Sequence, residues 1–166
     1  MKSFLISFLV FSLFFINDIS AKKIIVSRAG FTTSNGDVVS IHDDGPSAGG
    51  LALDSAVTDG VSLLRFVQVP HGYTVKNVKA FVKLNSAKRL SIVFYYVDIK
   101  TGDRIIIAQK DNLSDLNSSI QKIALDMVIS DHVINTKKYE YIAYLSFEDG
   151  GDDDNLTFYG MKINVE

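Results

Sequence analysis

The sequence predicts an all-β protein built as a two-sheet antiparallel β-sandwich of the jelly-roll type, with an immunoglobulin-like sandwich as the alternative. Two observations lead to this prediction. Apolar residues recur at every second position in several short segments, and we find no convincing helix. Turn residues such as Gly, Asn and Asp separate these segments, which is typical of strands that fold back on one another in two layers.

The clearest strands lie in the middle of the chain. In Asn77–Leu84, four apolar residues alternate with others that include Lys79 and Lys83. Successive side chains of a strand point to opposite faces, so this strand packs one face on a core and leaves the other in water. Leu90–Val97 is apolar in both registers, which predicts a central strand covered on both sides.

The same reasoning extends to both ends of the chain. Alternation predicts a strand over Leu156–Val165, in which Tyr159 and Met161 share one face. The glycine in Lys100–Asp103 supplies the backbone conformation of a tight hairpin. We expect His42–Gly60 to be one long loop and Lys110–Ser119 to be a second loop. The remaining expected strands are Lys23–Ser27, Val38–Ile41, Leu63–Val69, Arg104–Gln109, Lys122–Ile129 and Tyr139–Phe147.

Residues 1–21 have the pattern of a secretory signal peptide. Lys2 precedes the apolar run Phe4–Ile16, and a short polar region then ends at Ala21, the expected cleavage site. The run is shorter than the roughly 20 residues that a bilayer crossing requires, although an uncleaved anchor is the alternative. We therefore expect a secreted or otherwise extracytoplasmic protein with one domain over residues 22–166 and no membrane segment after cleavage.

Composition narrows the classes of function. The chain has no cysteine, which excludes disulfides, thiolate zinc sites and cysteine nucleophiles. A domain of this size buries about two-thirds of its unfolded surface, so an apolar core can hold the fold without covalent links. The formal net charge is −2. So small a net charge gives no overall field that attracts nucleic acid or anionic lipid, and we expect no nucleic-acid partner.

Short motifs between Val61 and Val165 resemble a β-sandwich domain of uncharacterised exported bacterial proteins. The resemblance implies the fold and no activity, so no catalytic residue is carried over from it. The matching features are Val69–Val75 (VPHGYTV), Asp98 before Thr101-Gly102, Tyr139-Glu140-Tyr141, and Phe158–Ile163 (FYGMKI).

An acidic stretch between the last two expected strands is a candidate calcium site. Calcium prefers six to eight oxygen ligands, and Asp149, Asp152, Asp154 and Asn155 offer such oxygens beside two glycines. The alternative is a solvated hairpin tip, where the same residue types are common. No cofactor other than calcium is indicated.

A second candidate is His42-Asp43-Asp44, at the start of the long loop. A histidine beside two carboxylates can bind a metal or act as a general base. The alternative is a surface histidine followed by turn aspartates. We find no nucleophile elbow, zinc-binding helix motif or phosphate-binding loop. We therefore expect no enzyme, with a carboxylate-based hydrolase as the least favoured alternative.

Tyrosines are concentrated in the strongest strands, at positions 95, 96, 139, 141, 144 and 159. Exposed tyrosines can stack on sugar rings, although such residues more often close a core with the hydroxyl at its rim. Asn112, Asn117 and Asn155 each begin a glycosylation sequon. The leading hypothesis is a non-enzymatic β-sandwich that binds a glycan or a protein through its loops. The alternative is a self-associating structural subunit.

The acidic stretch gives a testable prediction. If it binds calcium, millimolar calcium raises the melting temperature, because a ligand that binds only the native state stabilises it. Thermal unfolding with calcium, with magnesium and with chelator measures the effect. An unchanged melting temperature in calcium would contradict the site.

Overall fold

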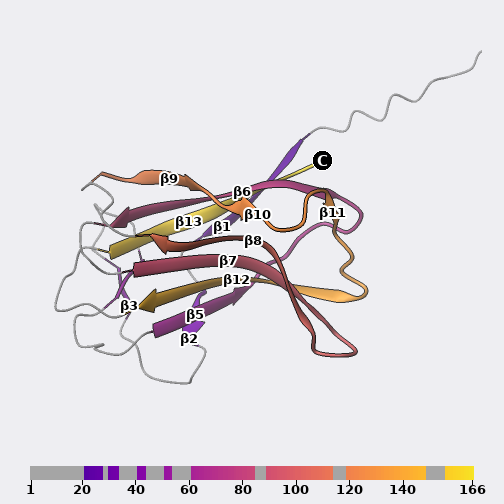
Figure 1. Cartoon of the computed structure of the whole chain (residues 1–166), viewed down its shortest axis with the longest axis horizontal. Helices are drawn as coiled ribbons and strands as arrows, with labels where there is room; N and C mark the ends of the chain where they lie inside the picture. The colour runs from indigo at the N-terminus through magenta and orange to yellow at the C-terminus, as the bar shows by residue number, and fades with distance from the viewer. Residues whose placement is uncertain are drawn as a thin grey trace, which may run out of the picture.

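The computed structural model describes residues 21–27, 30–33, 41–43, 51–53, 61–84, 89–113, 119–148 and 156–166. Within these ranges the chain forms thirteen strands and no helix, arranged as two antiparallel sheets that face one another (Figure 1). No helix in the described ranges has the length and apolar character for crossing a membrane. The predicted signal peptide, apart from Ala21, lies outside the described residues.

The seven-stranded sheet is centred on β6 (Thr74–Leu84) and β13 (Leu156–Val165), which pair along most of their length. The free edge of β13 carries two strands in succession, and so does the free edge of β6. These outer strands are β1 (Lys22–Ser27) and β4 (Leu51–Leu53) on β13, β9 (Gln121–Ala124) and β11 (His132–Val133) on β6, and β3 (Ile41–Asp43) on β4.

The six-stranded sheet has the order β10-β8-β7-β12-β5-β2. Its central strands are β7 (Arg89–Asp98) and β12 (Tyr139–Glu148), flanked by β8 (Arg104–Leu113) and β5 (Val61–Phe66). Short strands close its two edges, namely β10 (Asp126–Met127) and β2 (Thr32–Thr33). The predicted hairpin joins β7 to β8, with Gly102 at φ 76°.

The core lies between the sheets, as the alternation predicts. Val78, Ala80 and Val82 of β6 are fully buried, while Lys79 and Lys83 point away from the core. The central strand β7 is covered in both registers. Its residues at 90, 92, 94 and 96 join the main core, and those at 93 and 95 form a second cluster with Ile142 on the outer face. The prediction of a jelly-roll-like antiparallel β-sandwich is confirmed.

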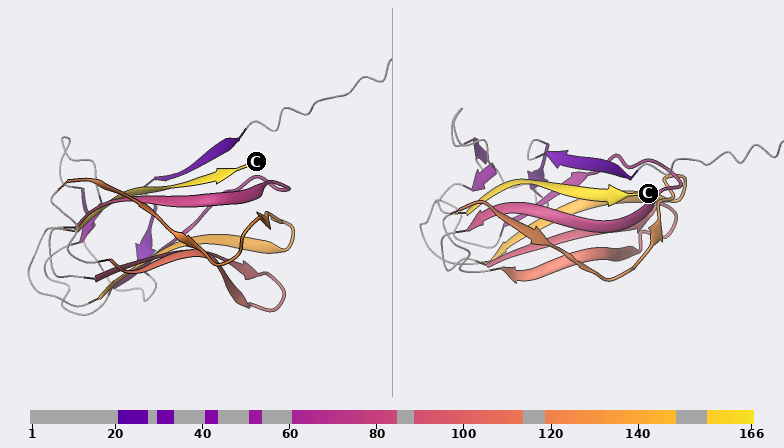
Figure 2. Two further views of the ribbon diagram at one scale, coloured as in Figure 1. Left: turned by 45° about the horizontal axis from the view of Figure 1, so that its top comes forward. Right: turned by 90° about the horizontal axis from the view of Figure 1, so that it is seen from above.

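One segment, residues 121–133, bonds to both sheets in turn. β9 pairs with β6, and Leu125 N–H donates to Val78 O at 3.0 Å. The chain then crosses to the other layer, where Val128 N–H donates to Ile107 O at 2.8 Å, and it returns to β6 as β11. Figure 2 (left) shows this orange segment passing between the layers and back. The crossing covers one lateral edge of the sandwich, which would otherwise present unpaired backbone groups.

Four expectations require correction. The predicted strand Lys122–Ile129 breaks at Leu125, because the chain changes sheets there. The predicted loop at Lys110 begins later, because β8 continues until Leu113 is buried opposite Leu90. The predicted loop His42–Gly60 contains the end of β3 and all of β4, which pair with each other. The predicted strand Leu63–Val69 is β5, which begins at Val61 and ends at Phe66.

The predicted face of Tyr159 is also wrong. A β-bulge lies between Phe158 and Gly160 of β13, so Phe158 rather than Tyr159 occupies the core beside Met161. Gly160 has φ 144°, and a Cβ built there would lie 2.8 Å from the carbonyl oxygen of Val26 in β1. The bulge therefore requires glycine, which allows β1 to approach β13.

Gly160→Ala is expected to lower the free energy of unfolding by about 3 kcal/mol, from backbone strain and a clash with a neighbouring strand. Gly102→Ala is the matched control, because Gly102 also has positive φ but nothing within 4 Å of its Cβ position. The control loses about 1 kcal/mol from strain alone. Chemical denaturation measures both, and equal losses would contradict the role given to the bulge.

Candidate functional site

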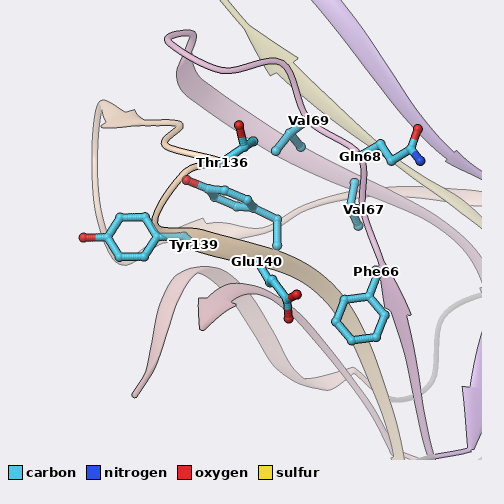
Figure 3. A pocket seen from close by; sticks show the side chains of 8 residues that line it. Phe66, Val67, Gln68, Val69, Thr136, Tyr139 and Glu140 are labelled. Carbon is cyan, nitrogen blue, oxygen red and sulfur yellow. The ribbon is translucent and has the colours of Figure 1, made fainter. Parts of the chain in front are cut away.

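An open groove of about 420 Å³ lies where β5 leaves the six-stranded sheet. Its two walls come from segments about 70 positions apart, the stretch Phe66–Val69 and the stretch from Thr136 to Tyr141 (Figure 3). We call it the Phe66 groove. It lies at the end of a sheet, beside two connections between strands.

The first wall follows from the way β5 ends. Val67 N–H donates to Tyr141 O at 2.8 Å, which extends the pairing with β12 by one residue. Pro70 has no N–H to continue a ladder, and Gly72, with φ 84°, turns the chain towards β6. Alternation places Val67 and Val69 on the core and leaves Phe66 outside, with 61% of its surface exposed.

The second wall is a turn fixed by a buried phenol. The N–H of Asn135 donates to the hydroxyl of Tyr141 at 2.8 Å, and His132 Nε2 lies 3.0 Å from the same hydroxyl. Lys138 N–H and Tyr139 N–H both donate to Asn135 O, and Thr136 N–H donates to His71 Nδ1. The turn is therefore held in place from both sides.

The protonation states of Tyr141 and His132 follow from the burial of both side chains. Burial raises the pKa of the Tyr141 phenol, and burial lowers the pKa of His132. A protonated phenol that accepts from Asn135 N–H still has its own hydrogen to give, and a neutral imidazole nitrogen accepts it. Tyr96 stacks on the His132 ring at 4.8 Å and lies 4.2 Å from Tyr139, between ring centroids. The second wall is thus held by a packed cluster of aromatic rings, those of Tyr96, His132, Tyr139 and Tyr141.

The mouth of the groove combines an apolar ring with polar groups. Figure 3 shows the side chains of Phe66 and Glu140 next to each other on one side of the ribbons, while Gln68 projects away from them. Val69 and Thr136 point towards each other from the two walls. Glu140, Gln68 and Thr136 are exposed, so their carboxylate, amide and hydroxyl are accessible to a ligand.

A second groove, of about 410 Å³, lies on the other side of the same stretch. It is lined by Ile24–Val26 of β1 and Arg65–Gln68, so it shares Phe66, Val67 and Gln68 with the first. Arg65 Nη1 donates to the backbone oxygen of Ser27 and, at 2.9 Å, to its Oγ. This contact links the two sheets along the lateral edge opposite the crossing segment.

The sites predicted from sequence lie elsewhere. The structure places His42 and Asp43 in strand β3, opposite Ala52 and Leu51, rather than in a loop. Asp44 and the proposed calcium ligands Asp149, Asp152, Asp154 and Asn155 lie outside the described residues. Within the part of the chain that is described, no group of three or more His, Asp and Glu residues is arranged to hold a metal ion.

The tyrosines singled out in the sequence are divided between the core and the outer faces of the sheets. Tyr96 and Tyr141 are buried in the core, whereas Tyr95 and Tyr144 form an edge-to-face pair on the outer face of the six-stranded sheet. The guanidinium of Arg104 lies 4.2 Å from the centre of the Tyr95 ring, and only 7% of Tyr95 is exposed. This pair is therefore covered by its own neighbours. Phe66, Gln68 and Glu140 were not among the candidates from sequence.

No protein-family model and no curated protein sequence matches the chain. Solved structures match its fold. Stig cyclase Fisc from Fischerella sp. TAU, in complex with an indole derivative, is 10% identical with a TM-score of 0.53, over 87% of this chain and 89% of that one.

Two carbohydrate-binding modules are also similar. TmCBM61 in complex with β-1,4-galactotriose is 10% identical with a TM-score of 0.48, over 82% of this chain and 89% of that chain. The xylan-binding module CBM15 is 12% identical with a TM-score of 0.47, over 87% of this chain and 97% of that module. At 10% identity, the likeness to the cyclase shows the fold alone and does not identify a ligand or an activity.

His132 makes stability depend on pH. Its pKa is lowered in the folded state from an ordinary 6.5, so the unfolded chain binds a proton first as the pH falls. The stability that neutral His132 contributes is fully present above about pH 6.5. It is lost as the pH falls from that value towards the folded-state pKa. In His132→Gln this contribution is absent, so its melting temperature should fall less than that of the wild type between about pH 7.5 and pH 5. Parallel melting curves for the two proteins would exclude His132 as the source.

Proposed function

We propose that this domain is a non-catalytic module that binds a saccharide in the Phe66 groove. The observation that carries the proposal is the exposed ring of Phe66, on the first wall, beside the carboxylate of Glu140, on the second wall that Tyr141 fixes. The proposal gives a location to the glycan or protein binding expected from the sequence, and it favours the glycan.

The chemistry of the groove suits a sugar. A pyranose presents C–H groups on a ring face and hydroxyls around its rim. The C–H face can lie on an exposed aromatic ring, which gains by removing apolar surface from water. The hydroxyls of the sugar can bond to the Glu140 carboxylate beside that ring and to Thr136 and Gln68, which also line the groove. A mainly apolar surface with a few polar groups is the usual composition of a small-molecule site.

The carboxylates favour binding over hydrolysis. Glycosidases in general use two carboxyl groups on opposite sides of the scissile bond, and Glu140 is the one carboxylate among the residues that line this groove. The nearby Asp98 accepts from Lys100 N–H at 2.9 Å and pairs with Lys138 at 3.4 Å. Hydrogen bonding to Lys100 N–H lowers the pKa of Asp98, so it is unsuited to be the general acid.

We also infer that the protein acts outside the cytoplasm. The expected signal peptide and the lack of cysteine support export without disulfide formation. The core described above holds the sandwich without covalent links, so the fold is compatible with either redox environment. Calcium binding by Asp149, Asp152, Asp154 and Asn155 remains a proposal for the same domain.

A glycan array followed by calorimetry tests the function. Phe66→Ala is expected to weaken binding of the selected oligosaccharide about tenfold or more, which corresponds to about 1.4 kcal/mol. Glu140→Gln should weaken binding while leaving the melting temperature unchanged, because Glu140 is exposed. Ile105→Ala, which removes an exposed apolar side chain elsewhere on the same sheet, is the matched control and should bind normally.

An array on which no glycan is retained would contradict the proposal, and so would normal binding by Phe66→Ala. Sedimentation of the same samples addresses self-association, the second candidate from the sequence. A concentration-dependent dimer that Phe66→Ala dissociates would favour that candidate over the saccharide.

A further inference from the structure

The outer face of the seven-stranded sheet is basic. Alternation puts the core residues of β1, β6, β9 and β13 on one side and leaves five lysines on the other, Lys23, Lys79, Lys83, Lys122 and Lys162. We call this surface the lysine face; Figure 2 (right) shows β1, β13 and β6 side by side in it. The described strands that carry these lysines contain no Asp or Glu.

The arrangement of two of these lysines is unfavourable for the isolated protein. Lys79 of β6 lies directly opposite Lys162 of β13. Their neighbours across the sheet are Ala124 on one side and Ile25 on the other, and neither can neutralise them. Like charges directly opposite each other on adjacent strands destabilise a sheet. An anion bound between them would remove this repulsion.

Three described lysines outside the lysine face, Lys76, Lys110 and Lys138, have carboxylate partners. Lys76 bonds to Asp131 at 2.8 Å and to Glu166 at 2.7 Å, and Lys110 bonds to Asp126 at 3.0 Å. None of the lysines of the lysine face forms an ion pair with a described residue. Positive charge is therefore concentrated on one face of a chain whose net charge is −2. Net charge does not reveal such a distribution.

The lysine face also offers groups that can bind hydroxyls. Asn164 Nδ2 donates to Asn77 Oδ1, one row along the sheet from the Lys79–Lys162 pair. The remaining amide hydrogens of Asn77 and the oxygen of Asn164 can serve a ligand. In the next row on the other side, half-buried Phe81 lies opposite Lys122. Along the lysine face, the amide row Asn77–Asn164 is therefore followed by the Lys79–Lys162 row and then by the row that holds Phe81 and Lys122.

We propose that the lysine face binds a linear acidic polysaccharide, whose carboxylates or sulfates contact Lys79 and Lys162 and whose hydroxyls contact the Asn77–Asn164 pair. This second site uses residues and a sheet different from those of the Phe66 groove, so it stands or falls independently of the proposed function.

The composition of the face favours a polysaccharide over other polyanions. Duplex DNA is read by a helix or a two-stranded ribbon that enters the major groove and bonds to base edges. The lysine face is the outer face of a sheet, and its described residues include no arginine. Single strands bind on exposed aromatic rings, whereas Phe81 and Tyr159 are half-buried. Membrane binding uses apolar residues that insert, and Ile25 is the one large apolar side chain exposed among the described residues of the four strands β1, β6, β9 and β13 that form this face.

Retention on immobilised polygalacturonate tests the proposal. The wild type should bind at about 50 mM salt and be released by about 500 mM, since screening weakens contacts between exposed charges. Lys79→Ser/Lys162→Ser should weaken binding about tenfold or more, because both central cations are lost. Its melting temperature should equal or exceed that of the wild type, because a repulsion is removed, so weaker binding would not reflect unfolding.

Lys100→Ser/Lys110→Ser is the matched control, with the same change in charge on the six-stranded sheet. It should bind polygalacturonate nearly as the wild type does. The proposal would be overturned if both double variants lost polygalacturonate binding equally, or if the wild type were not retained on polygalacturonate at low salt. Tighter binding to an oligonucleotide or to phosphatidylserine vesicles than to polygalacturonate would also overturn it. Phe66→Ala should leave this binding unchanged, which separates the two sites.

Discussion

The contact between the inward faces of β6, β7, β12 and β13 is the interaction on which the rest of the structure depends. The chain has no cysteine, so apolar burial must offset the conformational entropy that folding removes. Phe94, Leu145, Phe158 and Ile163 are all fully buried between the layers. Each such side chain contributes about 1.5–3 kcal/mol relative to an exposed one. Disrupting this contact would separate the sheets and both surface sites with them.

Period-two burial also determines what remains outside. Since the inward positions take the apolar residues, each sheet has an outer row whose composition is free to differ. The outer face of the seven-stranded sheet carries lysines and amides. The six-stranded sheet instead covers Tyr95 with Arg104 and leaves Phe66 exposed at its end. One core therefore supports two surfaces of different chemistry, which face away from each other.

The long strands could be predicted from the sequence because their burial is regular. Thr74–Leu84 contains the expected alternation, and Arg89–Asp98 is covered on both faces as its two apolar registers predict. Leu156–Val165 follows its expected alternation from Met161 onwards. The short strands could not be predicted, because β3, β4, β10 and β11 have two or three residues each and depend on partners distant in sequence. The bulge at Tyr159 shifts the register by one residue without any signal except the following glycine.

The candidate sites were less predictable than the fold. The Phe66 groove joins a strand end to a turn about 70 residues later. The motif Tyr139-Glu140-Tyr141 lies in its second wall, but the resemblance it carries implied a fold and no binding site. The one hint of the groove was an aromatic residue shortly before Pro70. Lys79 and Lys162 were each visible as outward residues, yet their opposition depends on the pairing of β6 with β13. The small net charge gave no sign of the lysine face, because a sum over the chain conceals a segregated surface.

The position of β13 dictates the order in which the molecule can assemble. β7 and β8 are joined by a tight hairpin and can pair as soon as both exist. β13 instead lies between β6 and β1, and its pairing with β1 spans most of the chain. Non-local pairings of this kind form slowly. During vectorial synthesis, the nascent chain therefore carries β1 and β6 without their shared neighbour until residues 156–165 emerge, and the basic sheet is the last part of the sandwich to be completed.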